Sequence, residues 1–324
     1  MKFPIHLACT LFVGLFITGC SHKLSSVENN TTSKFRVLGY LASSRNWTGG
    51  INAIDLSAIT DLNLAFINPD STGNFVATND LKAVVQKAHA NNVRVFASIG
   101  GGNPPVWLAS LLKPDSRRLL INNIVSLADT FNFDGIDVDI ENELINDQYA
   151  GFVYDLAKAI KHSKKLLTAA LASWNGDLIH DTTLKRYDFI NIMSYDKTGP
   201  WDTTRPGQHS PFSMVKNDFD YFNRKRSISS GKLLIGLPFY GYGFGGGTAF
   251  GMSYKQIVAV YPGAEAKDEM LTREGATIYY NGIATIKQKT LFAKQNKASG
   301  IMIWQLLGDT TGSLSLLNAI NEAK

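Results

Sequence analysis

Five carboxylates fall within residues 133–143, which read FDGIDVDIENE. Asp137, Asp139 and Glu141 alternate with aliphatic residues, and this period of two indicates an extended strand with the three acids on one face. Unpaired carboxylates are costly to desolvate and repel one another, so such a row is unfavourable unless a reaction needs it. Burial beside other acids raises a carboxyl pKa, so the outermost acid, Glu141, can stay protonated and serve as a general acid.

Two other uses of this acidic row are disfavoured by the residue pattern. A calcium loop beginning at Asp137 needs Gly and Glu where the sequence has Asn142 and Gln148. The six histidines are scattered without ligand spacing, so we expect no metal and no cofactor.

Gly241, Gly243 and Gly246 match a nucleotide-binding glycine pattern, but no helix is predicted to open there, which disfavours a nucleotide site.

Strand and helix patterns alternate along residues 35–324. Eight short apolar segments are predicted strands: 35–41, 62–68, 93–99, 133–141, 165–172, 188–195, 232–239 and 300–306. Segments with helical periodicity separate them, which predicts parallel strands in a (β/α)8 TIM barrel, with a doubly wound sheet as the alternative. Residues 245–299 exceed the length of a crossover helix, so we expect an inserted loop or small subdomain there between the last two strands.

Tryptophans follow several of these strands. Four come shortly after the first, third, fifth and sixth strands and one lies in the eighth: Trp47, Trp107, Trp174, Trp201 and Trp304. Because barrel active sites lie at the carboxyl ends of the strands, we expect all five on one rim. Indoles present flat apolar surfaces on which the C–H faces of sugar rings can pack, so the pattern favours a carbohydrate groove.

The chain resembles glycoside hydrolase family 18, the chitinases and related endo-β-N-acetylglucosaminidases, over residues 35–310. Residues 134–141, DGIDVDIE, are similar to the family motif D-G-x-D-x-D-x-E. Three further segments are similar to sequence motifs of the family on strands three, six and seven: 98–101 (SIGG), 193–196 (MSYD) and 236–241 (GLPFYG). Trp304 resembles the tryptophan at the floor of the family's site.

This resemblance implies roles for individual residues. Glu141 would protonate the glycosidic oxygen, while the 2-acetamido oxygen of the substrate would attack the anomeric carbon. Asp139 would orient the acetamide, Asp137 would share a proton with it, and Tyr195 would bond the acetamide oxygen. The residues expected to bind the sugar are Tyr40, Phe66, Met193, Asp196, Trp201 and Trp304. Asp134 is expected to be structural.

The implied activity is hydrolysis of β-1,4-N-acetylglucosamine linkages with retention, in chitin or its oligomers. An endo-β-N-acetylglucosaminidase acting on the chitobiose core of N-glycans, a peptidoglycan-derived substrate and a non-catalytic lectin stay open. Ile140 and Asn142 replace aromatic residues that many relatives have beside the acid, which leaves the preferred chain length undefined. Residues 245–299 look short for the α+β insertion of processive chitinases, so we expect a shallow, endo-acting groove.

The first residues resemble a lipoprotein signal. An apolar stretch too short to span a bilayer precedes ITGC at 17–20, which predicts a signal peptide over 1–19 and lipidation of Cys20, with simple cleavage near Gly19 as the alternative. Residues 20–34 are polar and predict a flexible tether. We therefore expect a lipid-anchored protein of the bacterial envelope, on the outer membrane or the cell surface, that contacts a membrane only through the anchor.

The charge distribution limits the expected partners. The net charge is +5, yet no run of Lys and Arg is longer than the RKR at 224–226. A nucleic-acid groove needs a clustered basic stripe with interleaved aromatics, and none is visible in the sequence, so we expect no nucleic-acid partner. We expect a monomer whose partner is an N-acetylglucosamine-containing oligo- or polysaccharide.

Overall fold

The computed structural model describes residues 1, 4, 35–43, 46–76 and 78–324. The predicted signal peptide, Cys20 and the tether lie outside the described residues, apart from positions 1 and 4. All helices and strands described belong to one compact unit, residues 34–324. Because this unit contains the whole core, we expect it to fold without the preceding residues.

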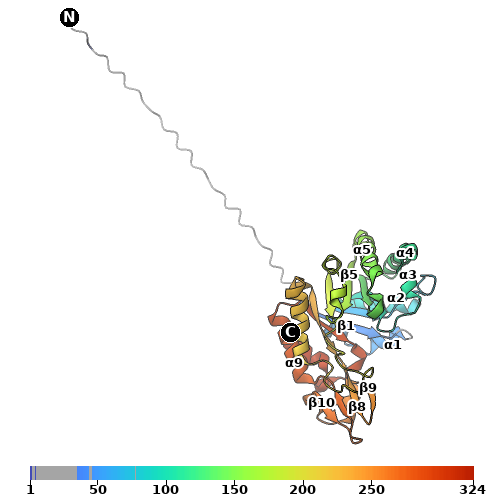
Figure 1. Ribbon diagram of the computed structural model, residues 1–324, viewed down its shortest axis with the longest axis vertical. Coiled ribbons are helices and arrows are strands. Elements are labelled where there is room, and N and C mark those ends of the chain that lie inside the picture. Colours follow the sequence, from blue (N-terminus) through green and yellow to red (C-terminus); the bar gives the residue numbers. More distant parts are fainter. Residues whose placement is uncertain (2–3, 5–34, 44–45, 77) are drawn as a thin grey trace. The chain divides into compact units, whose positions relative to one another are not determined.

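Eight parallel strands close into a barrel in the order β1-β12-β7-β6-β5-β4-β3-β2 (Figure 1). The strands are β1 (Arg36–Ala42), β2 (Asp61–Ala65), β3 (Arg94–Gly101), β4 (Gly135–Ile140), β5 (Leu166–Leu171), β6 (Phe189–Ile192), β7 (Leu233–Pro238) and β12 (Gly300–Trp304). All eight predicted strands are confirmed. Closure removes the free edges that a doubly wound sheet would have, so that alternative is wrong.

Helices on the outside cover the barrel. They are α1 (Trp47–Asn52), α2 (Asn79–Ala90), α3 (Leu108–Leu111), α4 (Pro114–Thr130), α5 (Asp147–His162), α6 (Asp181–Leu184), α7 (Phe212–Asp220), α9 (Ile283–Gln295) and α10 (Leu316–Ala323). In α5 the Asn146 side chain caps the Gln148 N–H, and Tyr149, Phe152, Val153, Leu156 and Ile160 bury one apolar face. In the ranges given above, no helix has the length and apolar character needed to cross a bilayer.

A separate antiparallel sheet is inserted between β7 and β12. Its strands, β8 (Tyr240–Gly245), β9 (Thr248–Ser253), β10 (Glu269–Leu271) and β11 (Thr277–Tyr279), pair in the order β10-β11-β8-β9 (Figure 1). The helix α8 (Tyr254–Val260) follows β9, and Ser253 and Gln256 cap its first turn reciprocally. The predicted subdomain is confirmed, but it begins at Tyr240 rather than 245 and is an α+β insertion, for which the segment had looked too short.

The tryptophans do not all lie on one rim. Trp47 is 6% exposed and packs in the main hydrophobic core, whereas Trp174 and Trp201 are 69% and 59% exposed. The prediction that all five tryptophans lie on the rim of the barrel is therefore wrong for Trp47. Its position in α1, whose buried face includes Trp47 and Ile51, makes it a packing residue.

Candidate active site

The acidic row lies on β4 between β3 and β5. Asp137 stands opposite Ser98 on β3 and Thr168 on β5, and Asp139 stands opposite Gly100. Gly100 has φ +114°, and a Cβ there would lie 2.1 Å from the Asp139 carbonyl oxygen. Only glycine therefore allows the end of β3 to approach β4 this closely, which gives the SIGG segment a physical reason.

Asp137 is fully buried and accepts four hydrogen bonds. Its Oδ2 accepts from the Tyr40 hydroxyl at 2.7 Å and from Ser98 Oγ at 2.8 Å. Its Oδ1 accepts from Thr168 Oγ1 at 2.6 Å and from Asn191 Nδ2 at 3.1 Å. Burial raises the pKa of Asp137, and these four donors oppose the rise by favouring the carboxylate. Asp137 is thus a fixed acceptor beneath the other acids.

Replacing Thr168 with Val tests the role of this network. The change removes one donor from a buried carboxylate, so we expect the free energy of unfolding to fall by about 1–3 kcal/mol. Chemical denaturation followed by circular dichroism measures it. Thr182→Val, at an exposed threonine of α6, is the matched control and is expected to stay within about 0.5 kcal/mol of the wild type. Equal effects of the two changes would contradict the assignment.

Asp139 lies one layer higher, and its side chain makes no hydrogen bond with any described residue. Its side chain is 3% exposed, and its Oδ1 is buried without a partner. Burial, and then the charges of Glu141 and Asp137, raise its pKa well above the usual value. A buried polar atom without a partner costs about 1–3 kcal/mol, so Asp139 is positioned at the expense of stability.

Glu141 follows the last residue of β4 at the mouth of the barrel. Burial, and then the charge of Asp196, raise its pKa to about 7. Its carboxyl group therefore holds its proton far more often at neutral pH than an exposed glutamic acid does. A proton donor of this kind suits acid catalysis near pH 7.

A cavity of about 220 Å³ joins these groups. It is lined by Phe66, Gly102, Asp139, Glu141, Met193, Tyr195, Asp196 and Trp304. Phe66 and Trp304 stack with ring centroids 5.6 Å apart and supply a flat apolar surface to the cavity. The cavity is smaller than the range of about 300–1,000 Å³ common for drug-sized ligands and suits a group the size of one sugar ring.

Two predicted sugar-binding residues do not line this cavity. Tyr40 is 1% exposed and lies under Trp304, with its ring centroid 5.3 Å away, so it supports the floor and holds Asp137. Trp201 is exposed and packs edge-on against Tyr242 at 5.8 Å, outside the cavity. The other predicted residues, Phe66, Met193, Asp196 and Trp304, converge on the space beside Glu141.

Tyr195 places a hydroxyl in the cavity with little competition from the protein. The hydroxyl donates to the Met302 sulfur at 3.7 Å, a weak acceptor. Burial, followed by the charges of Asp139, Asp196 and Glu141, raises the Tyr195 pKa well above its usual value. The hydroxyl therefore keeps its proton and can donate it in a hydrogen bond to a ligand oxygen.

Sequence reasoning missed the support of Asp196. The Tyr240 hydroxyl donates to Asp196 Oδ1, and the fully buried His209 places Nδ1 3.4 Å from the same oxygen. His209 Nε2 lies 3.3 Å from the Tyr240 carbonyl oxygen, so the imidazole bridges two segments. Asp196 has φ +63°, an uncommon conformation that the Tyr240 hydrogen bond helps to hold, whereas His209 Nδ1 lies near the carboxylate without forming a hydrogen bond. His209 comes from an irregular loop, and no periodic pattern marks it.

Asp134 and the possible metal-binding side chains are the last residues to be placed relative to the cavity. Asp134 Oδ2 accepts from the Val95 N–H at 2.7 Å and pairs with His89 at 2.8 Å, which ties β4 to β3 and α2 away from the cavity. Within the part of the chain that the structure describes, no group of three or more His, Cys, Asp or Glu side chains could hold a metal ion.

Comparison with known proteins places the chain in a family. The profile of glycosyl hydrolases family 18 matches residues 36–309, and the chain belongs to this family. A crystal structure of the GH18 chitinase ChiB of Flavobacterium johnsoniae is 36% identical, with a TM-score of 0.83 over 90% of this chain and 94% of that one. A chitinase from Bacteroides thetaiotaomicron is 27% identical, with a TM-score of 0.76 over 89% and 96% of the two chains. Endochitinase 1 of Metarhizium robertsii is 24% identical over 77% of this chain and 70% of its own.

Proposed function

We propose that this protein is a retaining glycoside hydrolase that cleaves β-1,4-N-acetylglucosamine linkages in chitin or chitooligosaccharides by substrate-assisted catalysis. The observation that carries the proposal is the pair Asp139 and Glu141. Both carboxyls have raised pKa values and lie on one small cavity, and neither makes a side-chain hydrogen bond to another described residue. Family membership and the named activity of the chitinase relatives support the substrate class.

In the proposed reaction each of these groups has a part. Glu141 gives its proton to the glycosidic oxygen as the bond from that oxygen to the anomeric carbon breaks. The acetamide oxygen of the same sugar bonds to the anomeric carbon and forms an oxazolinium ion. Asp139 then accepts a hydrogen bond from the acetamide N–H and balances the positive charge, while the Tyr195 hydroxyl orients the acetamide oxygen. Water opens the ring and returns a proton to Glu141, so the anomeric configuration is retained.

We propose a different role for Asp137 from the predicted sharing of a proton with Asp139. A proton shared between Asp137 and Asp139 would require a hydrogen bond between them, and the described side chains make none. Because four other donors already bond Asp137, we propose that the proton given to the substrate is held by Glu141. Asp137 then acts by fixing its neighbours and by its charge.

Hydrolysis of N-acetylchitooligosaccharides of graded length, beside a high-mannose N-glycopeptide, tests the proposal. We expect turnover of the oligosaccharides. Cleavage of the glycopeptide alone would indicate that the substrate is an N-glycan. Binding of the oligosaccharides without turnover would indicate a lectin.

Trp201 lies outside the cavity and is proposed to bind a more distant sugar. Trp201→Ala is expected to raise KM for the hexasaccharide by about 2–10-fold, because one aromatic contact contributes about 0.5–1.5 kcal/mol. Steady-state kinetics on the trimer is the internal control, since a short substrate need not reach Trp201. An equal rise of KM for both lengths would place Trp201 at the reacting sugar instead.

A further inference from the structure

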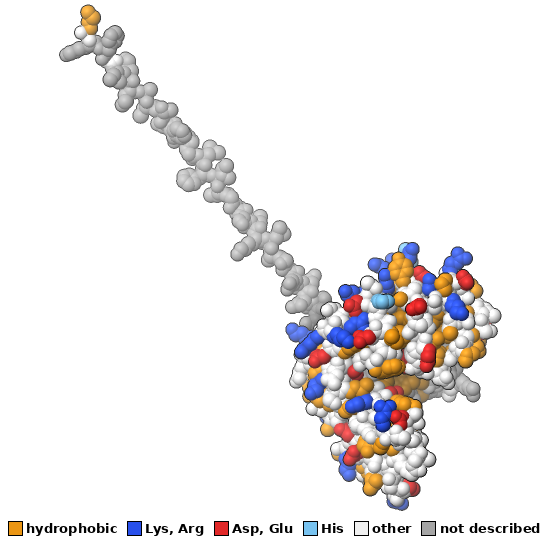
Figure 2. All heavy atoms as spheres, in the orientation of Figure 1, with side chains coloured by type: hydrophobic (Ala, Val, Ile, Leu, Met, Phe, Trp, Pro, Cys, Tyr) orange, Lys and Arg blue, Asp and Glu red, His pale blue; other side chains and the backbone are white. Residues whose placement is uncertain are grey.

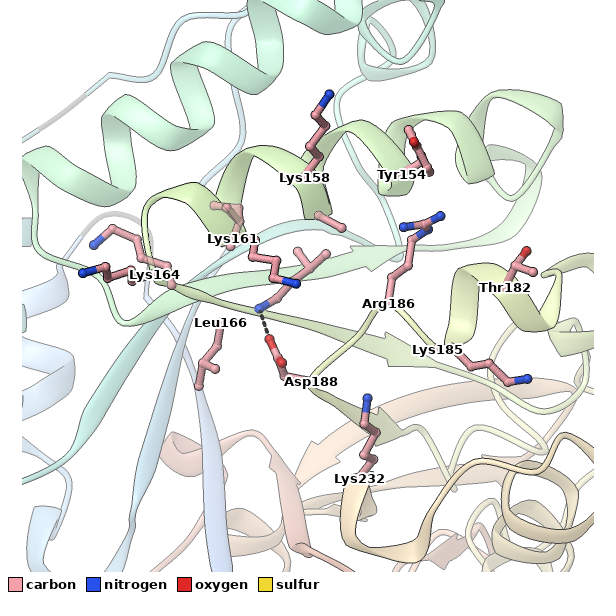
Figure 3. Close-up of a pocket in the computed structure, with 14 residues that line it drawn as sticks. Tyr154, Lys158, Lys161, Lys164, Leu166, Thr182, Lys185, Arg186, Asp188 and Lys232 are labelled. Atoms are coloured by element: carbon pink, nitrogen blue, oxygen red, sulfur yellow. Dashed lines mark hydrogen bonds between the residues drawn. The ribbon is translucent and has the colours of Figure 1, made fainter.

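A second cavity, larger than the one beside Glu141, lies at the end of the barrel opposite the catalytic acids. It measures about 780 Å³ and lies between the C-terminal half of α5 and the segments that lead into β5, β6 and β7 (Figure 3). Glu141, by contrast, follows the carboxyl end of β4. The two sites therefore face in opposite directions along the barrel axis. We call this cavity the basic groove.

Cationic side chains line the basic groove. Six of them form no ion pair with any described residue: Lys158, Lys161, Lys164, Lys185, Arg186 and Lys232. Lys161, Arg186 and Lys232 point toward the hollow in Figure 3. Blue side chains also stand out in Figure 2 along the edge that carries α5. Three of these six cations lie within residues 158–164, and the fold brings Lys185, Arg186 and Lys232 to them from two later segments.

The remaining contacts in the basic groove leave its positive charge in place. The only acid in the lining, Asp188, accepts the Leu167 N–H at 2.8 Å and is thereby held to the backbone. Arg186 lies over the ring of Tyr154 at 4.2 Å, which fixes an exposed guanidinium without neutralising it. A seventh cation, Lys165, lies 3.5 Å from Asp129. The groove thus has the charge and the hydrogen-bond donors to receive phosphate groups.

The chain enters the barrel at the same end as this groove, on β1, which lies across the barrel from β5 and β6. Arg36, the first residue of β1, lies 4.8 Å from the ring of Phe189, which follows Asp188 directly. Only the fifteen residues 20–34 separate the predicted lipid site at Cys20 from the described domain, and fifteen residues reach at most about 50 Å. Lipidation at Cys20 would therefore keep this end of the barrel close to a bilayer.

We propose that the basic groove docks on the phosphate headgroups of an anionic bilayer and so orients the catalytic mouth away from the membrane. Each cation near an anionic surface adds to the attraction, and the attraction weakens with salt. One weak lipid anchor and one basic surface together give more stable attachment than either alone. The orientation presents the active site to polymers outside the membrane.

Vesicle co-sedimentation of residues 35–324 tests this docking without any lipid anchor or turnover. We expect binding to phosphatidylcholine vesicles that contain phosphatidylglycerol, no binding to phosphatidylcholine alone, and release at high salt. The triple variant Lys158→Glu, Lys161→Glu, Lys185→Glu is expected to lose about tenfold or more in affinity. A control variant with the same change in net charge, Lys82→Glu, Lys113→Glu, Lys255→Glu, alters exposed lysines outside the groove and is expected to bind nearly as well as the wild type.

Several results would overturn the docking proposal. They are equal binding to neutral vesicles, equal losses in the two triple variants, and capture of RNA or polyphosphate at physiological salt without capture of vesicles. The last would assign the basic groove to a soluble polyanion. Hydrolysis of a soluble oligosaccharide by the groove variant should match the wild type, so a failure of docking is distinguishable from a failure of the proposed activity.

Discussion

Replacing Glu141 with Gln is expected to lower kcat by about 10²–10⁴-fold, because the amide has no acidic proton to give to the glycosidic oxygen. KM should change much less, since the amide keeps the shape of the carboxyl group. Initial rates on an N-acetylchitooligosaccharide, with protein concentrations matched by absorbance, measure both constants. An unchanged kcat would show that Glu141 is not the general acid.

The neighbouring Glu143 provides a matched control for this variant. Glu143 is exposed and lies two residues further along the chain, so Glu143→Gln should keep the wild-type kcat. The pH profile adds a second readout. Because the pKa of Glu141 is raised to about 7, the wild-type rate should fall as the pH rises above that value. The residual activity of Glu141→Gln should lack this fall.

The same pKa also makes stability depend on pH. Glu141 has a pKa of about 7 in the folded protein against the ordinary value of 4.5, so the folded state binds more protons between these two values. Wild-type stability should therefore decrease as the pH rises through this window, and Asp139, whose pKa is also raised, adds in the same direction. Thermal unfolding at several pH values should show a smaller decrease for Glu141→Gln.

Asp139→Asn is expected to lower kcat by about 10²–10³-fold. The change removes the negative charge that faces the developing cation in a buried site, where charge stabilisation is strongest. Single-turnover rates on the same oligosaccharide separate this loss from product release. A kcat within a few-fold of the wild type would show that Asp139 does not carry the charge stabilisation.

Asp134→Asn supplies the contrast within the same motif. Asp134 bonds the Val95 N–H and His89 and stays out of the cavity, so its replacement should lower the free energy of unfolding by about 1–2 kcal/mol and leave kcat unchanged. If Asp134→Asn and Asp139→Asn lowered kcat equally, the division between structural and catalytic acids would be wrong.

Much of the barrel could be predicted from local pattern. The strands could be recognised because each is a short apolar run bounded by helical periodicity, and the acids of β4 stood out because they interrupt such a run. Thr168 and Asn191 are likewise polar residues within the apolar strands β5 and β6. The sequence therefore held a signal for the donors around Asp137, although that signal alone does not say that they meet one carboxylate.

Features that depend on distant segments could not be predicted. His209 reaches Asp196 from a loop, and its role follows only from the fold. Trp47 follows β1 closely enough to suggest the rim, yet α1 turns it into the core. Four of the seven cations of the basic groove fall within residues 158–165, but the other three come from two later segments, so the sequence alone does not show that they meet.

The anomeric configuration of the first product tests the central claim most directly. Proton NMR during the hydrolysis of N-acetylchitohexaose resolves the two anomers before they interconvert in solution. Attack by the acetamide of the substrate, followed by water, predicts that the β anomer forms first. Initial formation of the α anomer would mean direct attack by water, and would contradict the substrate-assisted role assigned to Asp139 and Glu141.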